Sequence, residues 1–408
     1  MNKKYDVVIV GGGPAGMAAA IESQKTGAKT LLIERDSSLG GILNQCIHSG
    51  FGLHYFGEEM TGPEYAYRFE QEFKKCGAEC WLSSYVIALD SGWVKVQNKE
   101  GIQIVECKSI VLAMGCRERT AGAISLLGSR PSGVWTAGQV QKMVNIYGKL
   151  PCKNPIILGS GDIGLIMARR LAFEGAKPQM VLEIQKQTSG LKRNILQCLE
   201  DFNIPLFLQT TVVEAVGYPQ LREVVIVKVD ENMKPIESTK KRVACDGLIL
   251  SVGLIPETDL VGDMEFNPKT SSAIVDEFRM TSKEGIFACG NVLHVHDLVD
   301  FVTRESSLVG KNAGMYSLGK LKKGKKRKIV AGNGVRYTVP NSYYEGDGTM
   351  EILFRVTQKF VKTNINVLAN GKTVFKKFIL SASMGEMQSI VVDKKLLSGD
   401  IEISLGEV

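Results

Sequence analysis

One cysteine and one histidine are the candidates for redox or proton chemistry near the start of the chain. Cys46 and His48 lie in the glycine-rich segment LGGILNQCIHSGFG, residues 39–52. A thiol there has two interpretations: a redox group that cycles through a sulfenic acid or mixed disulfide, or a small side chain that packs beside a ligand. A histidine can donate a proton near neutral pH. The motifs around this segment indicate which interpretation applies.

A glycine motif just before this segment predicts a nucleotide-binding turn. Residues 7–10 form an apolar run of strand length, and glycines follow with the spacing G-x-G-x-x-G: Gly11, Gly13 and Gly16. A helical pattern then ends near Gly27, and a second short strand, 30–33, ends at Glu34. This order is typical of a dinucleotide-binding unit, because the glycines let backbone N–H groups approach a pyrophosphate and the acid accepts bonds from ribose hydroxyls.

The same unit recurs later in the chain. Its glycines repeat the first three at a constant offset of 148: Gly159, Gly161 and Gly164. Glu183 repeats Glu34 at an offset of 149. An acid at this position favours an unphosphorylated ribose, so the second unit is predicted to bind NAD(H) rather than NADP(H). Lys186 and Lys192 lie nearby and weaken that preference.

Two such units in one chain are the organisation of flavoproteins that bind FAD in one domain and a nicotinamide nucleotide in another. Three further segments support it: SIVLAMGCRERT (109–120), GLILSVGLIPETD (247–259) and EGIFACGNVLH (284–294). On these motifs, residues 1–320 resemble the pyridine nucleotide–disulfide oxidoreductase superfamily. More narrowly, LGGILNQCIHSGFG, LAMGCRER and GSGDIGLIMARRL resemble flavoprotein subunits found with anaerobic glycerol-3-phosphate dehydrogenases. The flavin subunits of opine oxidases and hydrogen cyanide synthase are more distant likenesses.

The resemblance implies the residues that bind each cofactor. The FAD site would comprise Gly11, Gly13, Pro14, Ala15, Gly16, Glu34, Arg35, Gly41, Ala113, Gly115 and Asn291. The NAD(H) site would comprise Gly159, Gly161, Gly164 and Glu183. Asn291 departs from the superfamily, which usually has Asp there; an amide still donates and accepts hydrogen bonds but carries no charge. The helix expected within 297–321 would point its N-terminus at the flavin and favour the anionic reduced form.

The resemblance also bears on Cys46. Disulfide reductases have two cysteines that would fall here at Leu43 and His48, and the C-x-x-C of thioredoxin reductases occurs nowhere in the chain. We therefore expect no dithiol relay, and Cys46 to line the flavin pocket. Its helix-start position in the superfamily would lower the pKa of a thiol, so Cys46 and His48 remain the catalytic candidates.

No metal site is predicted. His294 and His296 alternate as residues of a strand do, but no third ligand is indicated. The chain has nine cysteines with no regular spacing, which argues against a zinc or iron–sulfur site. It also favours a reducing, cytoplasmic compartment.

Charge and hydropathy limit the partners. The net charge is +7, and the stretch KLKKGKKRK, residues 320–328, contributes seven basic residues. We interpret it as a solvated linker, with peripheral contact to an anionic membrane surface as the alternative. No motif for nucleic-acid binding accompanies it. No apolar run is long enough to span a membrane, and the N-terminal apolar run breaks into glycines, as a first strand would rather than a signal peptide.

The predicted architecture is α/β, with an inserted second domain and a β-domain at the end. A discontinuous FAD-binding Rossmann-like domain (1–120 and 265–325) surrounds an NAD(H)-binding Rossmann-like domain (121–264). Residues 326–408 comprise the basic linker and a small all-β domain, where apolar residues alternate and Asn370-Gly371 predicts a hairpin turn. We expect this domain to dock other subunits of a dehydrogenase complex, with simple self-association as the alternative.

The predicted activity is that of an FAD-dependent oxidoreductase. It would exchange a hydride with NAD(H) and pass electrons to or from a second small-molecule substrate or a partner dehydrogenase subunit. Two alternatives stay open: a stand-alone NADH oxidase or peroxidase that uses Cys46, and a flavin-bearing scaffold subunit whose nicotinamide site is vestigial.

Overall fold

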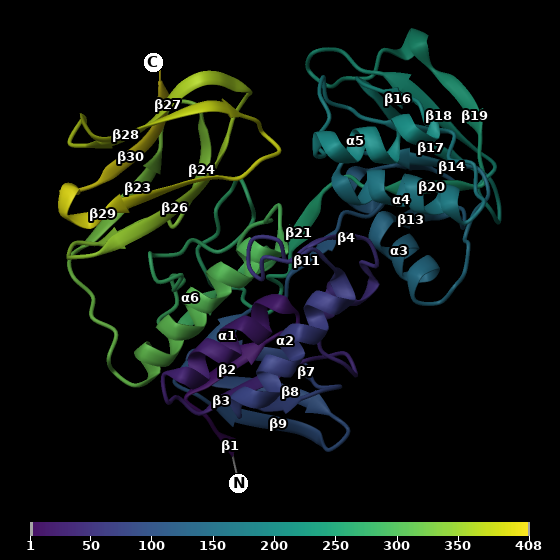
Figure 1. Cartoon of the computed structure of the whole chain (residues 1–408). Helices are drawn as coiled ribbons and strands as arrows, with labels where there is room; N and C mark the ends of the chain where they lie inside the picture. Colours follow the sequence, from purple (N-terminus) through teal and green to yellow (C-terminus); the bar gives the residue numbers. More distant parts are fainter. Residues whose placement is uncertain (1–2, 407–408) are drawn as a thin grey trace. The chain divides into compact units, whose positions relative to one another are not determined.

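The computed structural model describes residues 3–406, which form two compact units. One unit comprises the chain up to Cys116 together with the chain from Pro256 on, and the other comprises Arg117–Ile255. The chain passes between them through two short strands that pair with each other, β11 (Cys116–Glu118) and β21 (Leu254–Pro256). Figure 1 shows both units, with helices and strands labelled where there is room.

The first unit is built on a five-stranded sheet in the order β22-β10-β2-β3-β6, with every neighbouring pair parallel. The strands are β2 (Val7–Val10), β3 (Thr30–Ile33), β6 (Glu79–Trp81), β10 (Ser109–Leu112) and β22 (Ile286–Ala288). All residues of β2, β3, β10 and β22 are buried. Strands that are covered on both faces consist of continuous apolar residues, which is why these strands could be recognised in the sequence.

Three helices and three small elements complete the Rossmann-like part of this unit. The helices are α1 (Pro14–Lys25), α2 (Gly62–Cys76) and α6 (Val299–Ser317). Helices α1 and α6 pack very closely, since a Cβ at Gly310 would lie 2.0 Å from the carbonyl oxygen of Ala19. The segments beside the glycine turn are η1 (Gly41–Gln45), β4 (Ser49–Phe51) and β5 (Met60–Thr61). A second sheet has the order β1-β9-β8-β7 and contains β1 (Lys3–Lys4), β7 (Tyr85–Asp90), β8 (Trp93–Asn98) and β9 (Gly101–Glu106).

The second unit repeats the same kind of parallel sheet, in the order β13-β20-β14-β15-β16. Its strands are β13 (Val134–Thr136), β14 (Pro155–Leu158), β15 (Met180–Leu182), β16 (Leu206–Phe207) and β20 (Gly247–Leu250). The helices are α3 (Ala137–Asn145), α4 (Asp162–Phe173) and α5 (Lys192–Cys198). A further sheet, β12-β17-β18-β19, contains β12 (Leu127–Gly128), β17 (Thr210–Val216), β18 (Glu223–Lys228) and β19 (Lys241–Ala244).

The C-terminal residues form two packed β-sheets, so the predicted mixed α/β fold with a C-terminal β region is confirmed. The larger sheet has the order β25-β23-β30-β27-β28 and contains β23 (Lys326–Ala331), β25 (Ser342–Tyr344), β27 (Phe360–Ala369), β28 (Lys372–Ala382) and β30 (Ile401–Gly406). The smaller contains β24 (Val335–Val339), β26 (Thr349–Val356) and β29 (Gln388–Asp393). Asn370 and Gly371 both have positive φ and turn the chain between β27 and β28, as the sequence predicted. We call residues 326–406 the C-terminal β-sandwich.

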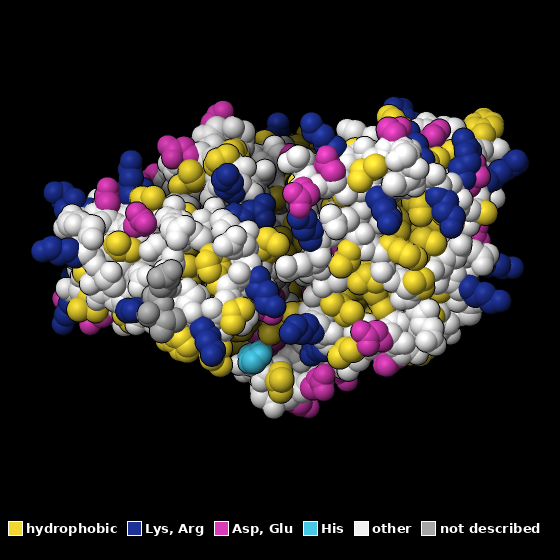
Figure 2. Space-filling model, turned by 90° about the horizontal axis from the view of Figure 1, so that it is seen from above, with side chains coloured by type: hydrophobic (Ala, Val, Ile, Leu, Met, Phe, Trp, Pro, Cys, Tyr) yellow, Lys and Arg dark blue, Asp and Glu magenta, His cyan; other side chains and the backbone are white. Residues whose placement is uncertain are grey.

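The basic stretch 320–328 is only partly the linker that we expected. Residues 326–328 belong to β23 and pair with β25. Lys323 forms an ion pair with Glu284, and Arg327 forms one with Glu345. Lys and Arg side chains are spread over the face drawn in Figure 2 and interspersed with Asp and Glu. Within residues 3–406, no helix combines the length and the apolar character needed to cross a membrane.

Candidate functional site

The first glycine turn joins β2 to α1 and leaves space beside the helix N-terminus. Gly11 has a φ of +107°, and a Cβ there would lie 2.5 Å from the carbonyl oxygen of Ala113. A Cβ at Gly16 would lie 1.7 Å from the carbonyl oxygen of Gly11, so only glycine allows this packing. A Cβ at Gly13 would meet nothing within 4 Å, and Gly13 is the N-cap of α1 without a side-chain cap. The helix N-terminus is therefore open to an anion.

Glu34 is anchored at the end of β3 by two backbone N–H groups. Its Oε2 accepts from Gly12 at 2.5 Å and its Oε1 accepts from Asp36 at 2.8 Å. The residue is buried, with 6% of its surface exposed. A carboxylate has about four lone-pair positions, so two remain for hydroxyl donors. The predicted neighbour Arg35 is exposed, and Ala15 is buried in α1.

The second unit repeats both backbone contacts of the acid and adds a hydroxyl donor. Glu183 accepts from the backbone N–H groups of Ser160 at 3.0 Å and Gln185 at 2.9 Å, and from the Ser160 hydroxyl at 2.5 Å. A Cβ at Gly159, whose φ is +102°, would lie 2.0 Å from the carbonyl oxygen of Ser251. The Oγ of Ser251 accepts from the backbone N–H of Gly164 at 3.1 Å. The repeat in sequence is thus a repeat in three dimensions.

One acidic residue in the second turn was missed by the sequence analysis. Asp162 is the first residue of α4 and lies where the first unit has Pro14. Its Oδ1 accepts from the backbone of Leu191 at 2.8 Å and from Nδ2 of Asn194 at 2.7 Å. This carboxylate places a negative charge at the helix N-terminus that would receive a pyrophosphate. The signal was visible as the letter D within GSGDIG.

The segment that carries Cys46 lies against the first glycine turn. Gly40 donates to the carbonyl oxygen of Gly12 at 2.9 Å, and a Cβ at Gly41 would lie 3.2 Å from the Cα of Gly13. Cys46 itself follows η1 as its C-terminal cap, so the expected helix-start position is wrong. Its thiol donates to the carbonyl oxygen of Ile42 at 3.3 Å. A carbonyl oxygen offers nothing to a thiolate, so this contact gives no activation.

Several other thiols are buried, and His48 contacts residues of its own segment. Burial raises the pKa of Cys107, Cys152 and Cys289 to about 12, which is typical of packing residues. His48 is partly exposed; its Nδ1 lies 2.9 Å from the carbonyl oxygen of Ser49, and its ring packs on Phe51 at 5.1 Å between centroids.

The segment 290–298 leads from β22 to α6, and we call it the 290–298 loop. The Oδ1 of Asn291 accepts from the backbone N–H of His296 at 3.2 Å. This contact orients the amide, so its NH₂ is the group left to donate to a ligand. Gly115, the other predicted residue near here, has a φ of +73°, and its carbonyl oxygen accepts from Glu257.

Helix α6 begins directly after the 290–298 loop. Its N-cap, Leu298, provides no side-chain cap. In the first turn, the buried carboxylate of Asp300 accepts from the backbone of Gly52 at 3.2 Å and of Tyr55 at 2.9 Å. The loop that follows Cys46 is thereby fixed to the start of α6. The sequence analysis expected a helix within 297–321, and the structure has it from Val299 to Ser317.

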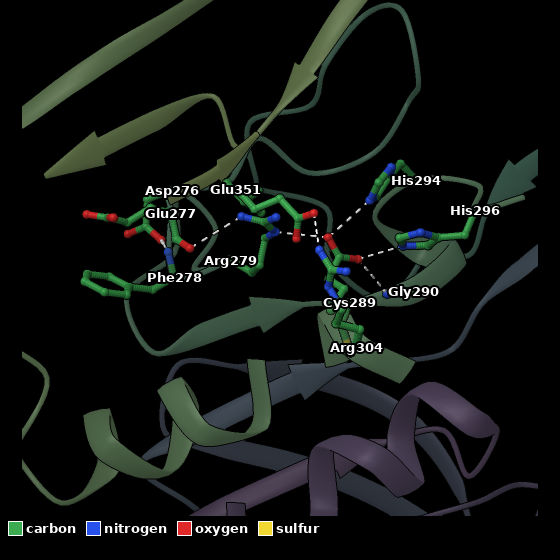
Figure 3. Close-up of polar contacts among 12 residues, drawn as sticks. Asp276, Glu277, Phe278, Arg279, Cys289, Gly290, His294, His296, Arg304 and Glu351 are labelled. Atoms are coloured by element: carbon green, nitrogen blue, oxygen red, sulfur yellow. Dashed lines mark hydrogen bonds and ion pairs between the residues drawn. The ribbon is translucent and has the colours of Figure 1, made fainter. Parts of the chain in front are cut away.

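A buried carboxylate, Glu305 of α6, accepts hydrogen bonds from two other segments, one at Arg279 and one in the 290–298 loop. It accepts from Nε2 of His294 at 3.1 Å, Nε2 of His296 at 2.9 Å and Nε of Arg279 at 3.0 Å. The backbone N–H of Gly290 donates to it at 3.3 Å. Figure 3 shows these residues converging from separate parts of the chain. We call these five residues the Glu305 cluster.

Burial and charge fix the protonation of this cluster. Burial lowers the pKa of His294 to about 4, against the opposing pull of Glu305. His294 is therefore neutral at pH 7 and donates its Nε2 proton to the carboxylate. Burial alone would raise the pKa of Glu305, but His294 and His296 hold it well below its usual value. Arg279 supplies the compensating positive charge with 2% of its side chain exposed.

The expectation that no third ligand accompanies the two histidines is wrong. Glu305 joins His294 and His296, and the ligand atoms lie within 4.8 Å of one another. However, the same carboxylate accepts from Arg279 and Gly290, so its lone pairs are occupied. A metal ion would have to displace both imidazole protons beside a guanidinium charge. The geometry therefore favours a hydrogen-bonded cluster, and the absence of a metal remains a prediction.

Comparison with known proteins points to one family. Residues 5–310 match the family model described as pyridine nucleotide-disulphide oxidoreductase. Hydrogen cyanide synthase subunit HcnB of Pseudomonas aeruginosa is 26% identical over 76% of this chain and 70% of its own length. The NAD(P)H coenzyme A polysulfide/persulfide reductase of Pyrococcus horikoshii is 25% identical over 73% of this chain and 65% of its own length. Thioredoxin reductase of T. acidophilum has the same fold over 78% of this chain and all of its own, with a TM-score of 0.63 and 20% identity.

Proteins of the matched family use FAD and NAD(P)H. The two glycine turns fit such dinucleotides. The middle glycines of the two turns are Gly13 and Gly161, and a Cβ on either would clash with no neighbouring atom. Each of them precedes a helix whose N-terminus has no side-chain cap. In each, an anchored acid stands at the end of the following strand. The first turn is neutral and the second carries Asp162, which is the main chemical difference between them.

Proposed function

Because the chain belongs to the pyridine nucleotide-disulphide oxidoreductase family, we propose that it is an FAD-dependent oxidoreductase that exchanges a hydride with NAD(H). The observation that carries this proposal is the repeated turn, in which Glu34 and Glu183 make equivalent backbone contacts. Bound FAD would supply the two-electron chemistry. The residues of the chain bind and orient it.

Each site residue has a task in this proposal. The uncapped start of α1 and Gly13 would receive the FAD pyrophosphate, and Glu34 would accept bonds from the adenosine ribose. Asn291 would donate its NH₂ to an oxygen of the cofactor. The backbone N–H groups in the first turn of α6 would face the flavin, and Asp300 would fix this turn to Gly52 and Tyr55. Glu183 would hold the ribose of NAD(H).

We further propose that a partner dehydrogenase subunit receives or supplies the electrons, as the resemblance to glycerol-3-phosphate dehydrogenase complexes implies. One relative, HcnB, is itself a subunit of a larger enzyme. The C-terminal β-sandwich supports docking: β28 lies at the edge of its sheet and exposes Phe378 (50%) and Leu380 (70%). Apolar residues on an exposed edge strand favour association. The ion pairs of Lys323 and Arg327 leave the basic stretch less suited to a membrane surface.

A second candidate function is the flavin-bearing scaffold with a vestigial nicotinamide site. Asp162 is the observation that favours it, because a carboxylate at the helix N-terminus opposes a pyrophosphate. The third candidate, a peroxidase that uses Cys46, gains no support from the bond between its thiol and Ile42.

The deciding experiment is an anaerobic titration of the purified yellow protein with NADH, followed by visible spectroscopy. Full bleaching of the flavin by about one equivalent supports the proposed oxidoreductase without a further disulfide. Consumption of about two equivalents reveals an additional redox thiol pair. A flavin that stays oxidised contradicts the proposal and favours the scaffold.

A further inference from the structure

The 290–298 loop is held from one side by the Glu305 cluster. Glu305 binds Gly290 at the start of the loop and both histidines within it. Arg279, on the opposite side of the carboxylate, has a φ of 65°, which non-glycine residues rarely adopt. The cluster is almost completely removed from solvent, with side-chain exposures of 0–3% for Arg279, His294, His296 and Glu305. Such a cluster fixes the backbone that it binds.

The same loop is held from the other side by the C-terminal β-sandwich. Arg355 of β26 donates from Nη2 to the carbonyl oxygen of Val295 at 3.0 Å and to Oδ1 of Asp297 at 2.5 Å. The Oδ2 of Asp297 accepts from the backbone N–H of Met387 at 2.6 Å. Both charged side chains are mostly buried, with 14% of Arg355 and 20% of Asp297 exposed. The sandwich thus binds the loop directly with two of its own segments.

We propose that the C-terminal β-sandwich is part of the FAD site, because Arg355 positions the 290–298 loop that carries Asn291. This inference rests on the proposed function, in which the first unit binds FAD. Arg355 is a positioning residue: it binds Val295 and Asp297, between Asn291 and the start of α6. Without it, the sandwich would keep its contact from Met387 to Asp297 and lose both contacts from Arg355. A protein that binds the sandwich could then change the binding of FAD through Arg355 and the 290–298 loop.

The chain offers a matched control for this contact. Arg304 of α6 pairs with Glu351 of β26, so it also joins the Rossmann-like part of the unit to the sandwich. Its side chain is 59% exposed, and the pair lies outside the 290–298 loop. Removal of Arg304 breaks an ion pair between α6 and β26. Removal of Arg355 breaks one between the 290–298 loop and β26. Of the two removals, that of Arg355 takes contacts away from the loop.

The test compares R355M and R304M in the full-length protein. FAD is removed from each, and the dissociation constant of FAD is measured by quenching of flavin fluorescence. We expect R355M to raise this constant by about tenfold, which corresponds to the loss of one hydrogen bond to a charged group. R304M should change it by less than about twofold, as expected of an exposed pair. The visible circular dichroism of bound flavin should change in R355M alone.

Two further variants keep the inference open to refutation if R355M does not fold. R355K retains the charge but loses the forked donor, and D297N removes the charge from the loop itself. Both should weaken FAD binding while NADH binding to the second unit is unchanged. Equal FAD constants for all four variants and the wild type would overturn the role of the sandwich. A wild-type protein that binds no FAD would instead overturn the proposed function.

Discussion

The internal repeat provides a sharp test, because each of its two acids can be removed alone. In Glu183→Ala, the lost carboxylate no longer accepts from the ribose hydroxyls of NADH. Hydrogen bonds to a charged group contribute about 1.5–3 kcal/mol, so the dissociation constant of NADH should rise between about tenfold and 150-fold. FAD content should be unchanged, since Glu183 lies in the other compact unit. The variant should also discriminate less against NADPH, because no acid opposes the 2′-phosphate.

The cost to stability can be separated from this effect. Ser160 and Gln185 lose the acceptor of their N–H groups in Glu183→Ala, and a buried donor without a partner costs about 1–3 kcal/mol. Glu183→Gln keeps an oxygen acceptor and should recover part of that stability while NADH binding stays weak. The measurements are NADH affinity by fluorescence, FAD content by absorbance and unfolding by circular dichroism.

Glu34→Ala is the matched control, with the opposite expected pattern. It should lose FAD and retain NADH binding, since Glu34 accepts from Gly12 and Asp36 in the first unit. The reasoning is refuted if Glu183→Ala binds NADH within twofold of the wild type, or if it loses FAD as Glu34→Ala does. Either result would mean that the two turns do not divide the cofactors as proposed.

Three further predictions concern the second turn, the thiol and the buried histidines. Asp162→Asn keeps the acceptor for the backbone N–H of Leu191 but removes the negative charge. Because the repulsion between this charge and the pyrophosphate is about 1 kcal/mol, NADH should bind about fivefold more tightly to the variant. An unchanged NADH affinity in a calorimetric titration would contradict this. Cys46→Ser should leave peroxide-dependent NADH turnover and the flavin spectrum unchanged, and a loss of turnover would support the peroxidase alternative. Metal analysis of the purified protein should find well under one zinc or iron per chain, and chelator should not lower the melting temperature, because Glu305 already accepts from Arg279.

The sequence predicted the parts of this fold that depend on neighbouring residues. Buried strands such as β2 and β14 appear as short apolar runs, and the glycines mark the turns after them. The hairpin at Asn370-Gly371 was equally clear, because its positive φ angles restrict the residues that fit. These signals are local, so a single sequence contains them.

The Glu305 cluster was not predictable in the same way. Its members come from residues 279, 290, 294, 296 and 305, and tertiary packing alone brings them together. His294 and His296 were interpreted as alternating strand residues, whereas both turn toward the same carboxylate in an irregular segment. The basic stretch was misjudged for a related reason: the strand that pairs with residues 326–328, β25, lies further along the chain. Contacts over such separations leave no periodic pattern.

The differences between the two turns follow from the roles that we propose for them. A resident cofactor has to remain bound through many reactions, whereas a nicotinamide substrate has to leave after each one. The first turn is neutral, and the 290–298 loop beside its unit's sheet is fixed by both Glu305 and Arg355. The second turn places the charge of Asp162 at the start of α4. The same kind of turn can therefore serve a site for a resident cofactor and a site for an exchanging one, and FAD should bind much more tightly than NADH. Equal dissociation constants for the two would contradict this division.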